Sequence, residues 1–175
     1  MKNQALSWRR IVRFVVPLLL TLLWLGFIFG NSLQTGEESG SQSKLALAWL
    51  THLLESVGIP LSVSEHFLRK LAHFSEYAIL ALLYISDLWA FGVIAARHPS
   101  PRAVALTFSC VPFCFLCAAF DEFCLQGMTV GRGPQWTDVL IDTAGAFTAA
   151  LLLTVAVLLV HLLRKKKDAS ERIQP

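Results

Sequence analysis

Four long apolar runs constrain this chain more than any other feature. They cover about residues 11–30, 71–95, 103–120 and 139–163, and roughly 20 apolar helical residues suffice to cross the hydrocarbon core of a membrane. Hydrophobic residues make up 55% of the 175 residues and charged residues only 15%, which is too apolar for an ordinary soluble domain. We therefore predict an all-α integral membrane protein with four transmembrane helices, forming a single domain over residues 1–175 with a basic tail at 164–175.

The first run is preceded by three arginines, Arg9, Arg10 and Arg13. A basic start before an apolar stretch is also typical of a signal peptide, but no convincing cleavage site with small residues follows. The run is long enough to span, so we expect an uncleaved first helix.

The stretch between the first two runs is polar. Residues 31–43 are rich in Gly, Ser and Glu and are predicted to be a linker. Residues 44–57 are too short and too polar to span a membrane, yet their apolar side chains recur at helical spacing: Leu45, Trp49, Leu53 and Val57. This pattern predicts an amphipathic helix that lies on the membrane surface.

Short local signals mark where the helices end and begin. Gly58 and Pro60 are expected to end the amphipathic helix. Ser62, with Glu65 three residues later, predicts a capping box for a helix that continues into the second span. Ser100 followed by proline at position 101 predicts the N-cap and first turn of the third span.

The distribution of Lys and Arg predicts how the chain is oriented. All but four of the 15 lysines and arginines flank the ends that share a side with the two termini. The four on the other side are Lys44, Arg69, Lys70 and Arg132. Because cytoplasmic loops carry the excess of basic residues, we predict that both termini are cytoplasmic and that the amphipathic helix is extracytoplasmic.

This topology places most of the unusual polar residues at one depth, the outer boundary. Arg69, His73, Glu76 and Tyr77 share one face at the start of the second span. The loop from Asp121 to Asp138 and its flanks add the remaining candidates: Lys70, Asp121, Glu122, Gln126, Arg132, Asp138 and Asp142. In the fourth span, Gly145 and Ala149 form a pair of small residues that lets a neighbouring helix approach closely.

Two interpretations of this cluster are open. The charges could pair with one another and only fix the loops, since ion-pair networks also gather near interfaces. Ionisable groups inside a membrane are costly, however, and are functional by default. We favour a functional polar pocket because the charges exceed what folding a small bundle requires.

Other polar residues and the cysteines carry less weight. Asp87 lies deeper in the second span, where Arg97 or Arg102 is as good an explanation for it as any function. Cys110, Cys114 and Cys117 follow helical spacing in an apolar run and are expected to act as small hydrophobic side chains. Neither a redox site nor a zinc site is completed by neighbouring residues, and a structural disulfide is not expected.

Two stretches of the chain resemble the signature segments of VanZ-like membrane proteins. They are RKLAHFSEYAILALLY at 69–84 and DEFCLQGMTVGRGPQWTDVLIDTAGA at 121–146, and GNSLQTGEESGSQS at 30–43 is similar to the family's segment after the first span. The family's pattern falls on Arg69, Lys70, His73, Phe74, Glu76, Tyr77, Asp121, Glu122, Gln126, Gly131, Arg132, Asp138 and Gly145. One departure is Asp142, where the pattern has Asn. The resemblance implies a cell-membrane protein with an outer polar site and a link to glycopeptide resistance of the teicoplanin type.

The sequence supports two main hypotheses of function. In the first, the outer site binds an anionic lipid or a lipid-linked cell-envelope precursor, with Arg69, Lys70 and Arg132 holding phosphate. In the second, a membrane enzyme acts on a lipid-linked or glycopeptide-related substrate, with His73 as general base or nucleophile and Glu76 or Asp121 as its carboxylate. Tyr77, Glu122, Gln126, Asp138 and Asp142 complete the expected ligand site.

Cofactors and alternative classes are less well specified. No cofactor is expected, although the acids could hold a divalent cation, for which oxygen ligands are suited. A nucleic-acid partner is not expected, because the basic residues flank apolar spans. A transporter or channel has little support, since no repeated broken helices are visible. The sequence does not specify an oligomeric state.

Overall fold

The computed structural model describes residues 2–59, 63–94 and 99–171. Within them the fold is helical and contains no strand, and four segments are long and apolar enough to cross a membrane: Ile11–Ser32, Glu65–Ala90, Pro101–Met128 and Trp136–Ala169. The predicted all-α fold with four spanning helices is therefore confirmed. The chain is a membrane protein.

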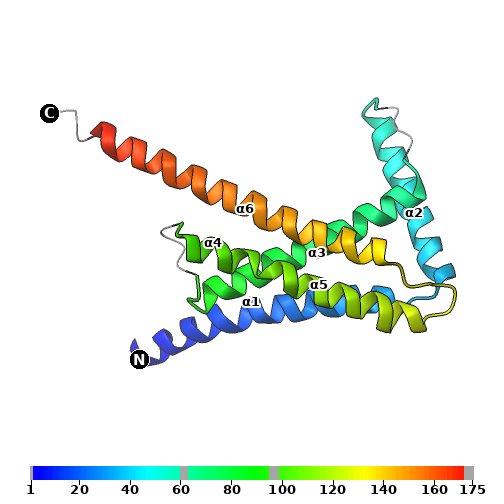
Figure 1. Ribbon diagram of the computed structural model, residues 1–175, viewed down its shortest axis with the longest axis horizontal. Coiled ribbons are helices and arrows are strands. Elements are labelled where there is room, and N and C mark those ends of the chain that lie inside the picture. Colours follow the sequence, from blue (N-terminus) through cyan, green and yellow to red (C-terminus); the bar gives the residue numbers. More distant parts are fainter. Residues whose placement is uncertain (1, 60–62, 95–98, 172–175) are drawn as a thin grey trace.

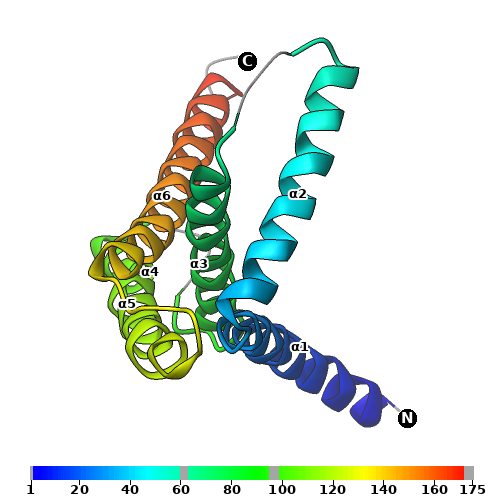
Figure 2. The ribbon, with the colours of Figure 1, turned by 90° about the vertical axis from the view of Figure 1, so that its right-hand side faces the viewer.

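The helices follow one another with short connections. They are α1 (Lys2–Ser32), α2 (Gly36–Ser56), α3 (Glu65–Ala90), α4 (Pro101–Phe108), α5 (Cys110–Phe120) and α6 (Trp136–Glu171), with a π-helical turn η1 (Asp121–Leu125) and a 3₁₀ turn η2 (Gln126–Met128) after α5. In Figure 1, α1, α3, α5 and α6 run along the long axis, and α2 crosses one end of this bundle. Figure 2 shows that most of α2 stands apart from the other helices.

The bundle has two distinct ends, which we call the polar end and the terminal end. At the polar end α1 finishes, α3 and α6 begin, and α2 crosses the bundle; at the terminal end α1 begins and α6 finishes (Figure 1). Both ends of the described chain therefore lie on one side of the bundle, as an even number of spans requires.

The stretch predicted to be a linker is mostly helical. α1 continues to Ser32 and α2 already begins at Gly36, so only residues 33–35 connect them. The linker prediction was wrong because it relied on the Gly and Ser content and overlooked a capping box. The Thr35 side chain accepts a hydrogen bond from the Glu38 amide, and the Glu38 carboxylate accepts one from the Thr35 amide. Reciprocal bonds of this kind satisfy the free amides of a first turn and start a helix.

The second span is shorter at its end than expected. α3 ends at Ala90, and Gly92 follows with a φ of 72°. This left-handed conformation suits glycine and ends a helix, because the amides after the last turn bond back to its carbonyls. At the other end, Ser64 caps α3 by accepting a hydrogen bond from the Phe67 amide. The predicted cap at Ser62 lies outside the described residues.

The third span is interrupted and then extended. Ser100 and Pro101 start α4 as predicted, and Ser100 accepts a hydrogen bond from the Ala103 amide. The helix breaks at Ser109, because Pro112 has no amide hydrogen and its ring clashes with the carbonyl four residues back. Beyond Phe120, helical backbone continues through η1 and η2 to Met128, where a loop had been expected from Asp121 onward. The loop is thus confined to residues 129–135.

The core is small and is built mainly from α3, α5 and α6. Its fully buried members are Tyr77, Leu80, Ala81, Ile85, Cys110, Cys114, Ala118, Val139, Ala146 and Ala150. The two cysteines pack as hydrophobic side chains, as predicted, and all four cysteines are free thiols. Many larger apolar side chains are exposed on the outside of the bundle, which is expected where lipid rather than protein surrounds a helix.

Gly145 sets the distance between α3 and α6. A Cβ atom at this position would lie 2.1 Å from the carbonyl oxygen of Phe74. A small residue at such a contact lets two helix backbones approach closely. The close approach that Gly145 and Ala149 predicted is therefore present, and it brings the first turns of α6 against the polar face of α3.

Candidate functional site

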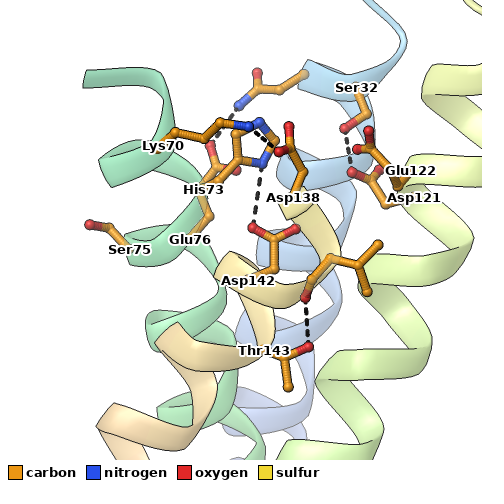
Figure 3. A network of polar contacts seen from close by, with 12 residues as sticks. Ser32, Lys70, His73, Ser75, Glu76, Asp121, Glu122, Asp138, Asp142 and Thr143 are labelled. Carbon is orange, nitrogen blue, oxygen red and sulfur yellow. Dashed lines mark hydrogen bonds and ion pairs between the residues drawn. The ribbon is translucent and has the colours of Figure 1, made fainter. Parts of the chain in front are cut away.

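The start of α3 supplies one wall of the candidate site. Lys70, His73 and Glu76 recur every three residues and share a face of the helix. Arg69 is exposed beside them, whereas Tyr77 is fully buried in the core. Figure 3 shows Lys70, His73 and Glu76 on the side of α3 that faces α6 and the end of α1.

Three polar side chains of the π-helical turn and the residue after it are buried in the protein. Asp121, Glu122 and Gln126 are 1%, 2% and 4% exposed, and the Gln126 amide bonds to the carbonyl of Asp121, five residues earlier. The wider turn also brings the two side chains together, since Gln126 Nε2 donates to Asp121 Oδ2 at 3.1 Å. Single π-helical turns within α-helices are frequent at functional sites.

A series of hydrogen bonds connects α1, η1 and the loop at 129–135. Ser32 Oγ donates to Asp121 Oδ2 at 2.8 Å. Arg132 Nη1 donates to Gln126 Oε1 at 3.2 Å and to the Ser32 carbonyl oxygen at 3.4 Å. Predicted residues from the third span and the loop are thus in contact, and Ser32 is an additional member. Ser32 was not among the predicted site residues, because it lies in the segment predicted to be a linker.

Two contacts join α3 to α6. Lys70 Nζ forms an ion pair with Asp138, and His73 Nδ1 lies 3.5 Å from Asp142 Oδ1 (Figure 3). Asp142 is only 1% exposed. The carboxylate in ion-pair contact with His73 is therefore Asp142, while both candidates named from the sequence have other partners. Glu76 accepts a hydrogen bond from Asn31, and Asp121 accepts those from Ser32 and Gln126.

Glu122 fixes the end of the loop at 129–135 through a backbone hydrogen bond. The Gln135 amide donates to Glu122 Oε1 at 2.7 Å. The start of α2 is fixed to the same loop, because the Gly36 amide donates to the Val130 carbonyl at 3.0 Å. A Cβ atom on Gly36 would lie 2.4 Å from the Gly131 carbonyl oxygen, so the contact requires glycine. α2 is thereby positioned over the polar end.

Two cavities open among these elements. The larger, of about 190 Å³, lies between α2, α3 and the end of α1, and its polar lining includes Asn31, Ser32, Gln34, Ser39, Gln42, Ser43, Arg69, His73, Glu76 and Arg132. The smaller, of about 60 Å³, is lined by His66, Arg69, Lys70, His73, Gln135 and Asp138. Arg69 and His73 line both. The serines and glutamines of α2 were not predicted to contribute.

The predicted site residues therefore fall into two groups. Arg69, Lys70, His73, Glu76, Arg132 and Asp138 line a cavity. Tyr77, Asp121, Glu122, Gln126 and Asp142 are buried behind the cavity walls. Members of the second group support the first, as the contacts from Asp142 to His73 and from Gln126 to Arg132 show.

The larger cavity is lined by two guanidinium groups, those of Arg69 and Arg132, and by one carboxyl group, that of Glu76. Burial lowers the pKa of the Arg132 guanidinium from its ordinary value, and the positive charge of Arg69 lowers it further. Arg132 Nε is buried without a hydrogen-bond partner among the described residues. Two guanidinium groups that line one cavity and repel each other are suited to an anion, because each can form paired hydrogen bonds to phosphate or carboxylate.

The chain offers no ready-made metal centre among the described residues, in which no group of three or more His, Cys, Asp and Glu side chains is arranged to hold an ion. Away from the site, Asp87 accepts a hydrogen bond from Thr21 Oγ1 at 2.7 Å. Of the arginine partners expected for Asp87, Arg97 lies outside the described residues, and Thr21 is the partner that the structure provides.

Comparison with known proteins gave one match. The model of the VanZ/LLP1 family matches residues 17–159, which include the second and third spans, most of the first and fourth, and every residue of the two cavities. No curated protein and no solved structure matches the chain.

Proposed function

The chain belongs to the VanZ/LLP1 family, and we propose that its larger cavity binds the phosphate of an anionic lipid or of a lipid-linked cell-envelope precursor. The observation that supports this proposal is the pair of guanidinium groups, Arg69 from α3 and Arg132 from the loop before α6, that line one cavity of about 190 Å³. Guanidinium recognises phosphate through paired hydrogen bonds.

The remaining walls suit such a ligand. Hydroxyl and amide side chains from α2, namely Ser39, Gln42 and Ser43, add neutral hydrogen-bonding groups. Two apolar residues, Ala46 of α2 and Leu68 of α3, also line the cavity. A lipid has an apolar tail as well as a charged headgroup, and this mixed lining favours a lipid phosphate over free phosphate.

The position of the cavity also favours a lipid. α2 buries none of its residues, and its apolar side chains are exposed, Leu45 at 72% and Trp49 at 70%. An amphipathic helix with such a face lies in the interfacial region of a bilayer. α2 crosses the polar end of the bundle (Figure 1), so we place the cavity at the depth of lipid headgroups.

We further propose that the polar end faces outward and the terminal end faces the cytoplasm, because the basic residues gather at the terminal end. Cys124 is the one exposed cysteine and belongs to η1 near the polar end. In this orientation a membrane-impermeant thiol reagent added to whole cells labels Cys124. Labelling only after the cells are opened would contradict it.

The binding proposal is tested by native mass spectrometry of the protein purified in mild detergent. We expect wild type to retain a phosphate-bearing lipid and the double variant Arg69→Ala, Arg132→Ala to lose it, because two cationic donors are removed. Arg164→Ala is the matched control: it removes one exposed positive charge at the other end of α6. Equal lipid retention in wild type and double variant would contradict the proposal.

The same variants test the link to glycopeptides that the family resemblance implies. If the bound lipid is a wall precursor, expression of wild type raises the teicoplanin concentration needed to stop growth, and the double arginine variant does not. Tolerance unaffected by wild type would remove resistance from the proposal and leave lipid binding in place.

A further inference from the structure

His73 stands between the two cavities. With Arg69 it lines both the larger cavity, which holds the arginine pair, and the smaller one of about 60 Å³. The other walls of the smaller cavity are polar: His66, Lys70, Gln135 and Asp138. A polar cavity of this size is large enough for water, since one water molecule needs roughly 10–15 Å³ of such volume. His73 is therefore placed between an anion pocket and a water pocket.

The imidazole of His73 is oriented by a buried carboxylate. Nδ1 lies 3.5 Å from Asp142 Oδ1, and neither atom has a hydrogen-bond partner among the described residues. Figure 3 shows one ring nitrogen turned toward Asp142 and the other turned away from it. When the proton resides on Nδ1 beside the carboxylate, Nε2 is the nitrogen that can accept a proton. Catalytic contacts are often long in a ligand-free site and shorten when substrate binds.

We propose that this site hydrolyses the terminal phosphate of a lipid phosphate, an activity that rests on the phosphate binding proposed above. Water in the smaller cavity attacks the phosphorus atom held by Arg69 and Arg132. A bond forms between the water oxygen and phosphorus, and the bond from phosphorus to the bridging oxygen breaks. His73 Nε2 takes the proton of the water and returns it to the bridging oxygen. The products are the dephosphorylated lipid and inorganic phosphate.

The surrounding charges suit this reaction. Transfer of a phosphoryl group spreads negative charge over its oxygens, and catalysis consists largely of positioning and electrostatic stabilisation. Arg132 lines the anion cavity, Lys70 lines the water cavity, and Arg69 lines both. His73 is the catalytic residue in this scheme, and Asp142 is a positioning residue that fixes the ring and its proton.

The test uses the full chain in lipid nanodiscs, with phosphatidic acid and farnesyl diphosphate as probes. Release of inorganic phosphate and binding of each probe are measured separately. We expect wild type to release phosphate from at least one probe, and His73→Gln to release it about 100-fold more slowly, the typical contribution of a general base. His73→Gln should still bind the probe, because both arginines remain. His52→Gln, on the exposed face of α2, is the matched control and should behave as wild type.

Asp142→Asn distinguishes positioning from a structural role. Asn has the same shape but no charge, so we expect kcat to fall about tenfold or more while KM stays within about twofold of wild type. A variant that merely loosened the fold would change KM and probe binding together.

The outcomes separate the two proposals. If both probes bind and neither is hydrolysed, the hydrolysis proposal is wrong and the binding proposal stands. If His73→Gln releases phosphate as fast as wild type, the role assigned to His73 is wrong. If neither probe binds nor is hydrolysed, both proposals fail.

Discussion

Buried acidic side chains have different surroundings at the two ends of the bundle. In the terminal half of the described chain, Asp87 is buried among apolar helices and accepts a hydrogen bond from one neutral hydroxyl, that of Thr21. At the polar end, four acids are buried within a few turns of one another, and cationic side chains and two cavities lie beside them: Asp121, Glu122, Asp138 and Asp142. One end has an isolated polar contact, and the other has a network.

This difference indicates which buried acids serve the fold alone. A single hydroxyl–carboxylate contact between α1 and α3 is what helix association in a membrane commonly uses, and such contacts contribute modestly. Unpaired buried atoms occur in both places, but Asp87 contributes only Oδ1, whereas the network at the polar end contributes several, among them Arg132 Nε and Glu122 Oε2. Since unpaired buried groups are costly, their concentration beside two cavities favours a role for the polar end beyond holding the helices together.

The largest expected effect comes from Gly145, which brings the two halves of the polar network together. Gly145→Ala places a Cβ atom 2.1 Å from the Phe74 carbonyl oxygen, so α3 and α6 must separate. We expect unfolding stability to fall by about 3 kcal/mol, the upper range for overpacking. The measurement is thermal unfolding in detergent.

Gly26→Ala is the control for that experiment. Gly26 lies in α1, and a Cβ atom there has no neighbour within 4 Å. It should leave stability unchanged or raise it slightly, because Ala is the better helix former. A small effect of Gly145→Ala, equal to that of Gly26→Ala, would show that the close helix contact is not needed.

A matched pair of variants tests the comparison of the two ends directly. Thr21→Val and Ser32→Ala each remove one hydroxyl that donates to a buried carboxylate, that of Asp87 or of Asp121. We expect Thr21→Val to lower the unfolding free energy by about 2 kcal/mol, since Asp87 loses the hydrogen bond from Thr21, and Ser32→Ala by about 1 kcal/mol, since Gln126 still donates to Asp121.

The order of the two variants should be reversed for lipid retention, with the larger loss in Ser32→Ala. Ser32 lines the larger cavity, and its hydroxyl bonds to Asp121, which shares Gln126 as a partner with Arg132; Ser32→Ala therefore weakens retention of the bound lipid, while Thr21→Val leaves it intact. Both are read by unfolding and by native mass spectrometry of the same preparations. Equal loss of lipid in the two variants would erase the functional distinction between the ends.

The smallest expected effect concerns the first turn of α2, which forms one wall of the larger cavity. Hydrogen bonds from the Thr35 amide and hydroxyl lower the pKa of the Glu38 carboxyl below its ordinary value. The stabilisation is therefore present above the ordinary pKa of 4.5 and is lost as the pH falls through the lowered value. Glu38→Gln should fray this turn near neutral pH.

Hydrogen exchange of the first α2 amides, wild type against Glu38→Gln, measures this effect. The difference between the two proteins should be smaller at an acidic pH below the lowered pKa of Glu38 than at neutral pH, because the wild-type carboxyl is then protonated as well. A difference that stays the same at both pH values would mean that the charge of Glu38 does not contribute to the cap.

Several features of the fold follow from local sequence signals. Ser100 with Pro101 marked the start of α4, and Gly145 with Ala149 marked a close helix contact. The segment at 31–43 was wrongly predicted to be a linker because of its composition, although the same residues contain the Thr35–Glu38 capping box that starts α2. The π-helical turn at Asp121 left no comparable signal, because the residues that follow an apolar run suit a loop equally well.

Some features of the candidate site could likewise be predicted from the sequence, and others could not. The polar face of α3 could be read from helical periodicity, since residues three and four apart in one helix are always neighbours. The choice of Asp142 over Glu76 or Asp121 as the contact of His73 could not, because all three carboxylates reach the same depth. The contribution of Ser32, Ser39 and Gln42 to a cavity was likewise invisible until α2 was placed.

The sequence alone therefore determined that this chain spans a membrane with four helices, that its polar residues gather at one boundary, and that it is VanZ-like. These properties depend on hydropathy and on neighbours within one helix. The tertiary structure decided which side chains meet across helices and where a cavity remains. That depends on the rotation and offset of each helix, which are set by contacts such as Gly145 against Phe74 and Gly36 against Gly131.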